Sequence, residues 1–282
     1  SVRSQVLDSA DFGVPQTRKR IVFIGIHSSL EVEPPILRGS GAVSSFSLER
    51  RNGGERVRYS VRSDRDLFAP LQRLQDADDS TFVTAQQALG DLEVLKAGER
   101  CDVLQADAIA PPTSEYQRRM RKGLGGVLTN VSVPRLNEDT RIRLSRLPPG
   151  GNFRDLPKEL TRRYLTGAKW GPSNGTGLLG RQHYYAYRRL HPDLWSWTLN
   201  TKADSVYHYR HARALSVREF ARLQSFPDRF VFTTDPRPGA LLGRIDGGSA
   251  HSRYRQVGNA VPPLLARAIA ATLVKLLSAD AR

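Results

Sequence analysis

The sequence has few cysteines, few methionines and no long uninterrupted apolar stretch. Its single cysteine, Cys101, excludes an internal disulfide framework and any zinc site built from several thiolates, and is typical of a reducing cytoplasm. The longest apolar stretch, near the C-terminus, is interrupted by Arg267 and Lys275. Because a membrane helix needs about 20 apolar residues, we expect no membrane span and no membrane partner.

Acidic residues are scarce relative to basic ones. The chain has 28 Asp and Glu against 43 Lys and Arg, a formal net charge of +15. Basic residues cluster at 118–122 and at 141–146. A polyanion is the natural partner of such a surface, because neutralising phosphates releases condensed counterions. The charge therefore predicts a nucleic-acid partner, although it does not by itself select DNA.

Metal ligands are equally sparse. His208 and His211 are three residues apart and could share a helical face, but no cysteine pair or carboxylate cluster lies near them in the sequence. We therefore expect no metal site, and we expect both histidines on the surface or facing DNA.

Local patterns predict several elements. Two apolar runs, Arg3 to Asp8 and Arg20 to Ile26, flank a Gly-Val-Pro turn and predict a strand pair. The second run is apolar on both faces, so we expect it inside a sheet covered on each side. Capping boxes at Thr84, Ser114 and Ser216 predict helix starts, and helical spacing predicts a final helix from Leu264 to Leu277.

Three strings stand out in order along the chain. They are GVPQTRKR at residues 13–20, LSVREFARLQSFPD at 215–228 and YRQVGNAVPP at 254–263. Together they resemble late sequence blocks of the DNA (cytosine-5) methyltransferases. Weaker similarities lie at 88–92, 114–121 and 148–152.

The resemblance implies an α/β fold. We expect the C-terminal portion of a Rossmann-like, S-adenosylmethionine-dependent methyltransferase fold, with an inserted mixed α+β, loop-rich target-recognition domain. Residues 1–32 would be the tail of the catalytic sheet. Residues 33–250 would be the recognition domain, with a flexible insertion at about 38–69, and residues 251–282 would return to the catalytic domain and end in a helix.

The first string contains the expected catalytic residues. In an extended segment Gln16, Arg18 and Arg20 lie on one face, and a guanidinium suits a phosphate or a carbonyl oxygen. A solvated basic strand end is the alternative. The resemblance implies that Arg20 contacts the O2 edge of an extruded cytosine while Arg18 and Gln16 brace the site.

The other strings contain the expected cofactor and scaffold residues. The resemblance implies that Gly258, Asn259, Ala260 and Val261 line the S-adenosylmethionine pocket, with Gly258 allowing close backbone approach. Alternatively, Asn259 caps the terminal helix. The expected DNA-binding or scaffold residues are Arg218, Glu219 and Arg181, with Glu219 capping its own helix.

Other blocks of that family are missing from the chain. The sequence has no glycine-rich cofactor loop and no glutamate-asparagine-valine block, and Cys101 lacks the proline before it and the glutamine after it that mark the family nucleophile. The chain also begins with Ser1 instead of methionine. We therefore expect the C-terminal part of such an enzyme, from a restriction-modification or phage system. Its partners would be double-stranded DNA and an N-terminal half with the catalytic cysteine, without which it is inactive.

A non-catalytic DNA-binding module derived from such an enzyme is the alternative. The two hypotheses differ in whether a complementary N-terminal half exists.

Overall fold

The chain forms two compact units. The computed structural model describes residues 1–40, 46–49, 58–61, 82–98, 101–166, 178–179, 187–233 and 249–280. Unit 1 comprises Ser1–Val83 and Val261–Arg282, and unit 2 comprises Thr84–Ala260. Both ends of the chain therefore belong to unit 1. The units divide the chain after residues 83 and 260, whereas the sequence suggests boundaries after residues 32 and 250.

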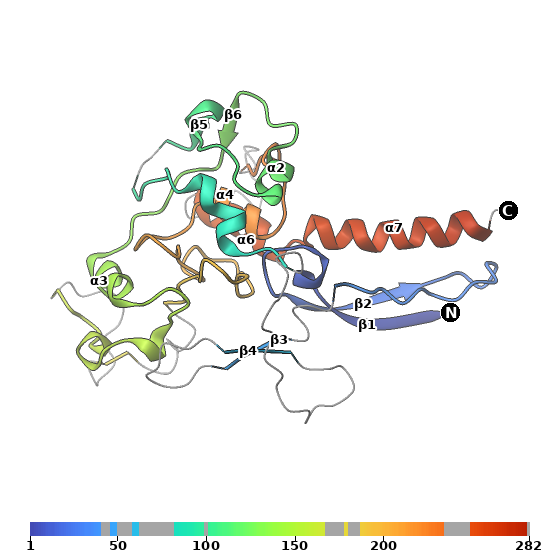
Figure 1. The fold of residues 1–282 in the computed structure, drawn as a ribbon, viewed down its shortest axis with the longest axis horizontal. Coiled ribbons are helices and arrows are strands. Elements are labelled where there is room, and N and C mark those ends of the chain that lie inside the picture. The colour runs from blue at the N-terminus through green and yellow to red at the C-terminus, as the bar shows by residue number, and fades with distance from the viewer. Residues whose placement is uncertain are drawn as a thin grey trace, which may run out of the picture. The chain divides into compact units, whose positions relative to one another are not determined.

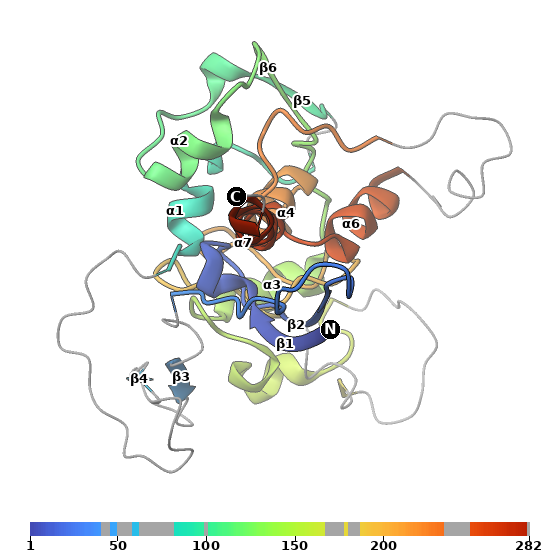
Figure 2. The ribbon, with the colours of Figure 1, turned by 90° about the vertical axis from the view of Figure 1, so that its right-hand side faces the viewer.

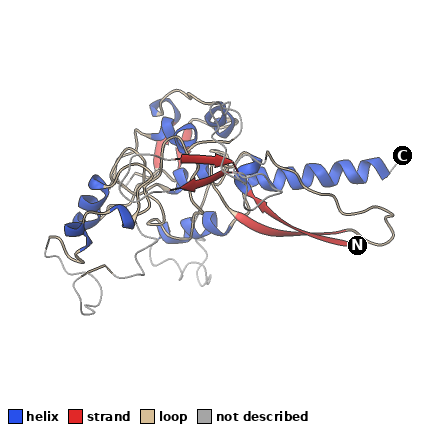
Figure 3. Ribbon diagram, turned by 60° about the horizontal axis from the view of Figure 1, so that its bottom comes forward, coloured by secondary structure: helices blue, strands red, loops and turns tan. Residues whose placement is uncertain are grey.

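An antiparallel ribbon of two strands opens unit 1 (Figure 1). β1 (Val2–Asp8) pairs with β2 (Lys19–Gly25), and these are the longest strands in the described residues (Figure 3). A 3-10 turn, η1 (Ser9–Phe12), follows β1 and ends at Gly13, whose φ of 78° lies in the left-handed region that favours glycine. The strand pair predicted from the sequence is confirmed.

The last helix covers the inner face of this ribbon. α7 (Pro263–Asp280) runs alongside β1 and β2 in Figure 1 and is seen end-on, next to them, in Figure 2. Its Leu265 is buried together with Leu7, Ile24 and Leu37, and further apolar side chains of the helix extend this cluster. The predicted terminal helix is confirmed, because its apolar residues recur at helical spacing and meet the inward side chains of the strands.

The outer face of the ribbon is open. Val6 faces Ile21 across the two strands, and the two side chains are 62% and 59% exposed; Phe23 is 67% exposed. The prediction that β2 is covered on both faces is therefore wrong for the described part of the chain. Each sheet there has only two strands, and α7 packs against one face of the ribbon.

A second short pair lies within the predicted insertion. β3 (Phe46–Glu49) pairs with β4 (Arg58–Val61) in antiparallel fashion. The rest of residues 41–69 lies outside the described residues.

Unit 2 is built from short helices, 3-10 turns and loops. Its described elements are α1 (Ala85–Leu89), η2 (Gly90–Leu92), β5 (Val103–Gln105), η3 (Ala106–Ala108), α2 (Glu115–Arg121), β6 (Val127–Thr129), α3 (Glu138–Arg146), η4 (Phe153–Asp155), η5 (Lys158–Thr161), α4 (Val217–Leu223) and α6 (Ser249–Asn259). β5 pairs with β6, while α1 contacts α2 and α4, and α4 contacts α6. The buried helix α4 is therefore central to the unit.

The helix starts follow from local chemistry. At Thr84 and Ser216 the capping box is complete, so the hydroxyl and the third helical side chain satisfy each other's backbone donors. At Ser114 only the hydroxyl half forms, because the Gln117 carboxamide accepts from the Thr113 N–H at 2.7 Å instead. All three predicted starts are observed.

Among the described residues, one segment is long and apolar enough for a membrane helix. Arg253–Ser278 has a window of mean hydropathy 1.6, of which 11% is buried. The sequence analysis predicted no membrane span, but the length and composition of this segment meet the criterion for one. This is weak evidence for a span, because core helices pass the same test, and Leu265 of this segment is buried against the ribbon.

Candidate functional site

The turn before β2 separates the three residues predicted to converge. Gln16 is fully buried, Arg18 is 5% exposed, and Arg20 is exposed with its Nη1 donating to the Lys19 carbonyl at 2.7 Å. Regular strand geometry begins only at Lys19. The alternation of side chains between two faces, which the sequence analysis assumed, therefore does not extend back to Gln16. Burial, and next the charge of Arg20, lower the pKa of Arg18 to about 10.

Asp8 organises this turn, a role that the sequence analysis missed. Its carboxylate accepts from the Thr17 hydroxyl at 2.7 Å, from the Arg18 N–H at 2.9 Å and from the Ala10 N–H at 3.2 Å. A buried carboxylate with three donors is held in one position. The position of Asp8 at the end of a predicted strand was the one sequence indication of this role.

The start of α4 is a buried polar scaffold in unit 2. Arg213 donates to both oxygens of Glu219 at 2.9 and 2.8 Å, and the Ser216 N–H donates to the same carboxylate at 2.7 Å. These side chains are buried. The predicted capping role of Glu219 is confirmed.

Arg218 joins loops through their carbonyl groups. Its guanidinium donates to the carbonyls of Thr129 at 3.0 Å, Pro227 at 3.3 Å and Phe230 at 2.6 Å. Burial is the main reason why the pKa of Arg218 falls to about 10. With its side chain fully buried, Arg218 acts as a scaffold residue in this structure.

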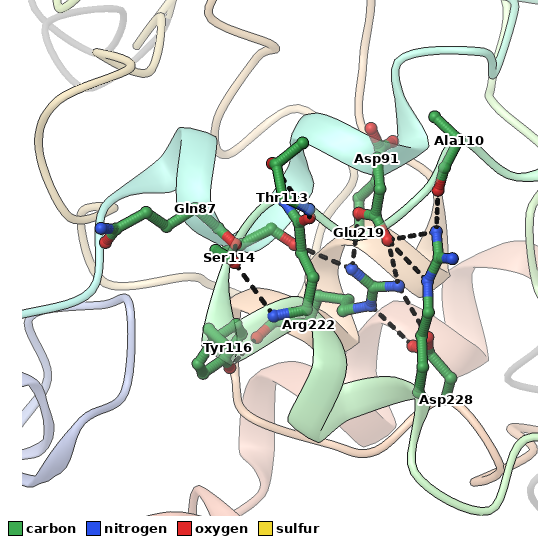
Figure 4. A network of polar contacts seen from close by, with 12 residues as sticks. Gln87, Asp91, Ala110, Thr113, Ser114, Tyr116, Glu219, Arg222 and Asp228 are labelled. Atoms are coloured by element: carbon green, nitrogen blue, oxygen red, sulfur yellow. Dashed lines mark hydrogen bonds and ion pairs between the residues drawn. The ribbon is translucent and has the colours of Figure 1, made fainter.

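Arg222 lies at the centre of the polar network in Figure 4. Its five N–H groups are all directed to acceptors: Asp228 at 2.7 and 2.6 Å, Asp91 at 2.8 and 3.1 Å, and the Ala88 carbonyl at 3.0 Å. All three charged side chains are fully buried. Burial alone lowers the pKa of Arg222, but the two carboxylates outweigh it and raise the pKa above its usual value.

Helix α2 completes this network. The Tyr116 hydroxyl donates to the Arg222 carbonyl at 2.5 Å, and Arg121 donates to Asp91 at 2.8 Å. Strings 88–92, 114–121 and 215–228, noticed separately in the sequence, therefore meet here. Their similarity to family blocks was the available indication, but nothing in the spacing predicted that Asp91 and Asp228 share one arginine.

The residue after α4 holds the end of α6. Gln224, a fully buried residue after α4, donates from Nε2 to the carbonyls of Val257 and Ala260, each at 3.1 Å. The Tyr254 hydroxyl donates to the Leu215 carbonyl at 2.6 Å. Gln224 was not singled out from the sequence, although it lies within the second string.

Gly258 lies in close contact with the backbone of Asn200. A Cβ placed there would lie 2.1 Å from the carbonyl oxygen of Asn200. Asn259 is the last residue of α6 and α7 begins at Pro263, so the alternative in which Asn259 caps the terminal helix is wrong. Asn259 is exposed and Val261 is 61% exposed.

The two histidines differ in exposure. His208 is fully buried, contrary to the surface position expected, whereas His211 is exposed. Cys101 is exposed and donates to the Val103 carbonyl. Within the described ranges no three His, Cys, Asp or Glu side chains are grouped as a metal would require. Arg181 lies outside the described residues.

Comparison with known proteins identifies the family. A model of C-5 cytosine-specific DNA methylases matches residues 1–275. The chain belongs to this family. Among its relatives, the type II methyltransferase M1.HphI of Haemophilus parahaemolyticus is 29% identical over 98% of this chain and 48% of its own length. M.DdeI of Desulfomicrobium norvegicum is 27% identical over 94% of this chain and 52% of its own length.

The family likeness extends to plants and to a solved structure. DNA (cytosine-5)-methyltransferase 4 of Arabidopsis thaliana is 28% identical over 98% of this chain and 17% of its own length. A protein described as a DNA modification methyltransferase encoded within an E. coli prophage superposes with a TM-score of 0.58 at 18% identity, over 99% of this chain and 61% of that one. The chain thus has a mixed α/β fold of this kind. It spans about half the length of the bacterial relatives M1.HphI and M.DdeI.

Proposed function

We propose that this chain is the C-terminal, target-recognition part of an S-adenosylmethionine-dependent DNA cytosine-5 methyltransferase from a restriction-modification or phage system, acting in the cytoplasm. It would hold the last part of a Rossmann-like catalytic domain and the inserted recognition domain. Double-stranded DNA would be its substrate. The family match over residues 1–275 is the observation that supports this function best.

A second polypeptide segment is proposed to complete the catalytic domain. The outer face of the β1–β2 ribbon is apolar and exposed, through Val2, Val6, Ile21 and Phe23. An exposed apolar surface of this kind marks a site of interaction with another protein segment. An N-terminal half with the remaining strands and the nucleophilic cysteine fits this face, and the exposed Cys101 lacks the sequence context of that nucleophile.

Arg20 is the proposed contact to the target base. It is exposed at the start of β2, while the buried Arg18 beside it and the Asp8-bound turn hold the strand entry in place. A guanidinium there would donate to the O2 atom of a cytosine turned out of the duplex and balance the charge that develops on the ring. Gln16 and Arg18 would brace this arginine.

The α6–α7 turn is the proposed cofactor contact. Bound S-adenosylmethionine supplies the methyl group for transfer. Asn259 exposes a carboxamide and Val261 an apolar side chain, a combination that suits a ligand with polar and apolar parts. Gly258 and Ala260 would contribute backbone only, since Gly258 packs on Asn200 and the Ala260 carbonyl is bound by Gln224.

A complementation assay tests this proposal. The isolated chain should bind duplex DNA and transfer no labelled methyl group, and activity should appear when a polypeptide with the family's N-terminal blocks is added. Arg20→Ala should abolish transfer in that mixture with DNA affinity little changed, whereas Lys19→Ala, the adjacent exposed cation, should leave transfer largely intact. Methyl transfer by the isolated chain, or full activity of Arg20→Ala, would contradict it.

A further inference from the structure

One surface of unit 2 combines exposed basic and apolar side chains. Arg119 and Lys122 are exposed at the end of α2, and Arg229 is exposed beside them. Phe230 and Val231 follow directly and are 46% and 51% exposed. We call these five residues the α2–Arg229 surface.

The two segments that form this surface are joined by hydrogen bonds. Arg229 Nη1 donates to the Lys122 carbonyl at 2.9 Å, and the Asp228 N–H donates to the Met120 carbonyl at 2.8 Å. Behind them the Asn130 side chain accepts from the Phe232 N–H and donates to its carbonyl, both at 2.9 Å. The surface is therefore held in position before any ligand binds, which lowers the entropic cost of binding.

The carboxylates of the described segments next to this surface are already paired. Asp228 and Asp91 are buried on Arg222, and Glu115 pairs with Arg118 at 3.0 Å. Within the described residues, Arg119, Lys122 and Arg229 form no ion pair with these carboxylates. Cations at a helix C-terminus also interact favourably with the helix dipole, but that effect does not explain the exposed ring of Phe230 beside them.

The loop after α2 is open at its two glycines. A Cβ placed at Gly125 or Gly126 would meet no other atom within 4 Å, and both residues are exposed. The loop is therefore open at these two positions.

We infer that the α2–Arg229 surface binds the phosphate backbone of duplex DNA, with its three cations on phosphate oxygens and Phe230 and Val231 against the deoxyribose. The inference rests on the proposed function and adds a DNA contact region to it. This region lies outside the three family strings, although Arg229, Phe230 and Val231 directly follow the second of them. Phosphate contacts position a protein on DNA without reading sequence. The surface would therefore strengthen binding equally for all DNA sequences.

A matched pair of double variants tests this inference. Arg119→Gln/Lys122→Gln removes two cations from the surface, and Lys96→Gln/Arg135→Gln removes one lysine and one arginine that are exposed elsewhere in unit 2. Fluorescence anisotropy of the 282-residue chain with a labelled duplex gives the affinity at several salt concentrations. Because each phosphate contact contributes about 0.9 to the salt slope, the first variant should lower the slope by about 1.8 and the affinity about 60-fold at 0.1 M salt.

The outcomes separate the two proposals. If the unmodified chain does not bind duplex DNA, both this inference and the DNA-binding part of the proposed function are wrong. If it binds and the two double variants bind equally well, the inference is wrong and the proposed function stands. Circular dichroism melting tests whether each variant is folded. If the double variant Arg119→Gln/Lys122→Gln does not fold, the single variants Arg119→Gln and Lys122→Gln replace it, and each should lower the salt slope by about 0.9.

Discussion

Replacement of Arg222 should destabilise unit 2 strongly. Arg222→Met removes five hydrogen bonds and leaves the carboxylates of Asp91 and Asp228 buried. Removing one partner of a buried ion pair costs about 3–5 kcal/mol, because the remaining charge is uncompensated. Arg121 still donates to Asp91, so the uncompensated charge is mainly that of Asp228. We therefore expect a loss of stability near the middle of that range.

Urea unfolding followed by circular dichroism measures this loss. The control is Arg118→Met, the same substitution in the exposed pair with Glu115, which should cost less than about 1 kcal/mol. If Arg222→Met does not fold, Arg222→Lys provides the measurement, because a lysine keeps the charge but cannot replace five donors in a planar fork. Its stability should lie well below that of the unmodified chain.

A small effect would refute this reasoning. If Arg222→Met and Arg118→Met lose similar amounts of stability, the network in Figure 4 does not hold α1, α2 and α4 together. Native stabilities of about 5–15 kcal/mol make the expected difference easy to detect.

Two further predictions concern close packing and pH. Gly258→Ala places a Cβ against the Asn200 carbonyl, so we expect a loss of about 1–3 kcal/mol in urea unfolding, while Gly125→Ala, in open space, should be nearly neutral; equal effects would contradict the packing argument. Burial, and next the Arg213 charge, hold the pKa of His208 well below 6.5. The unfolded chain then binds a proton that the folded chain does not, so the free energy of unfolding should fall as pH drops below about 6.5. His208→Asn should flatten this dependence, and an unchanged slope would exclude His208 as its cause.

Local signals in the sequence predicted much of the fold. The strand pair, the helix starts at Thr84, Ser114 and Ser216, and the terminal helix all depend on hydrophobic spacing or on capping side chains within a few residues. The covered second face of β2 was predicted wrongly. The sequence shows that a strand is apolar on both faces, but it does not show whether the chain supplies the covering layer.

The candidate site was predicted less completely. Gln16, Arg18 and Arg20 were expected on one face, but the turn ahead of β2 buries the first two and exposes the third. Asp8 and Gln224 were missed because their roles depend on backbone groups that folding brings to them. Hydrogen-bond partners of this kind leave no periodic pattern in a sequence.

By itself, the sequence determined the family strings, the excess of basic residues and the local elements, because each depends on residue identity at short spacing. Only the tertiary structure decided which arginines are structural and which remain exposed. Asp91 and Arg222 are 131 positions apart, and no local pattern relates them. A guanidinium is buried where the fold supplies several carboxylate and carbonyl acceptors, as at Arg222. It stays in water where a neighbouring carbonyl is the acceptor, as at Arg20.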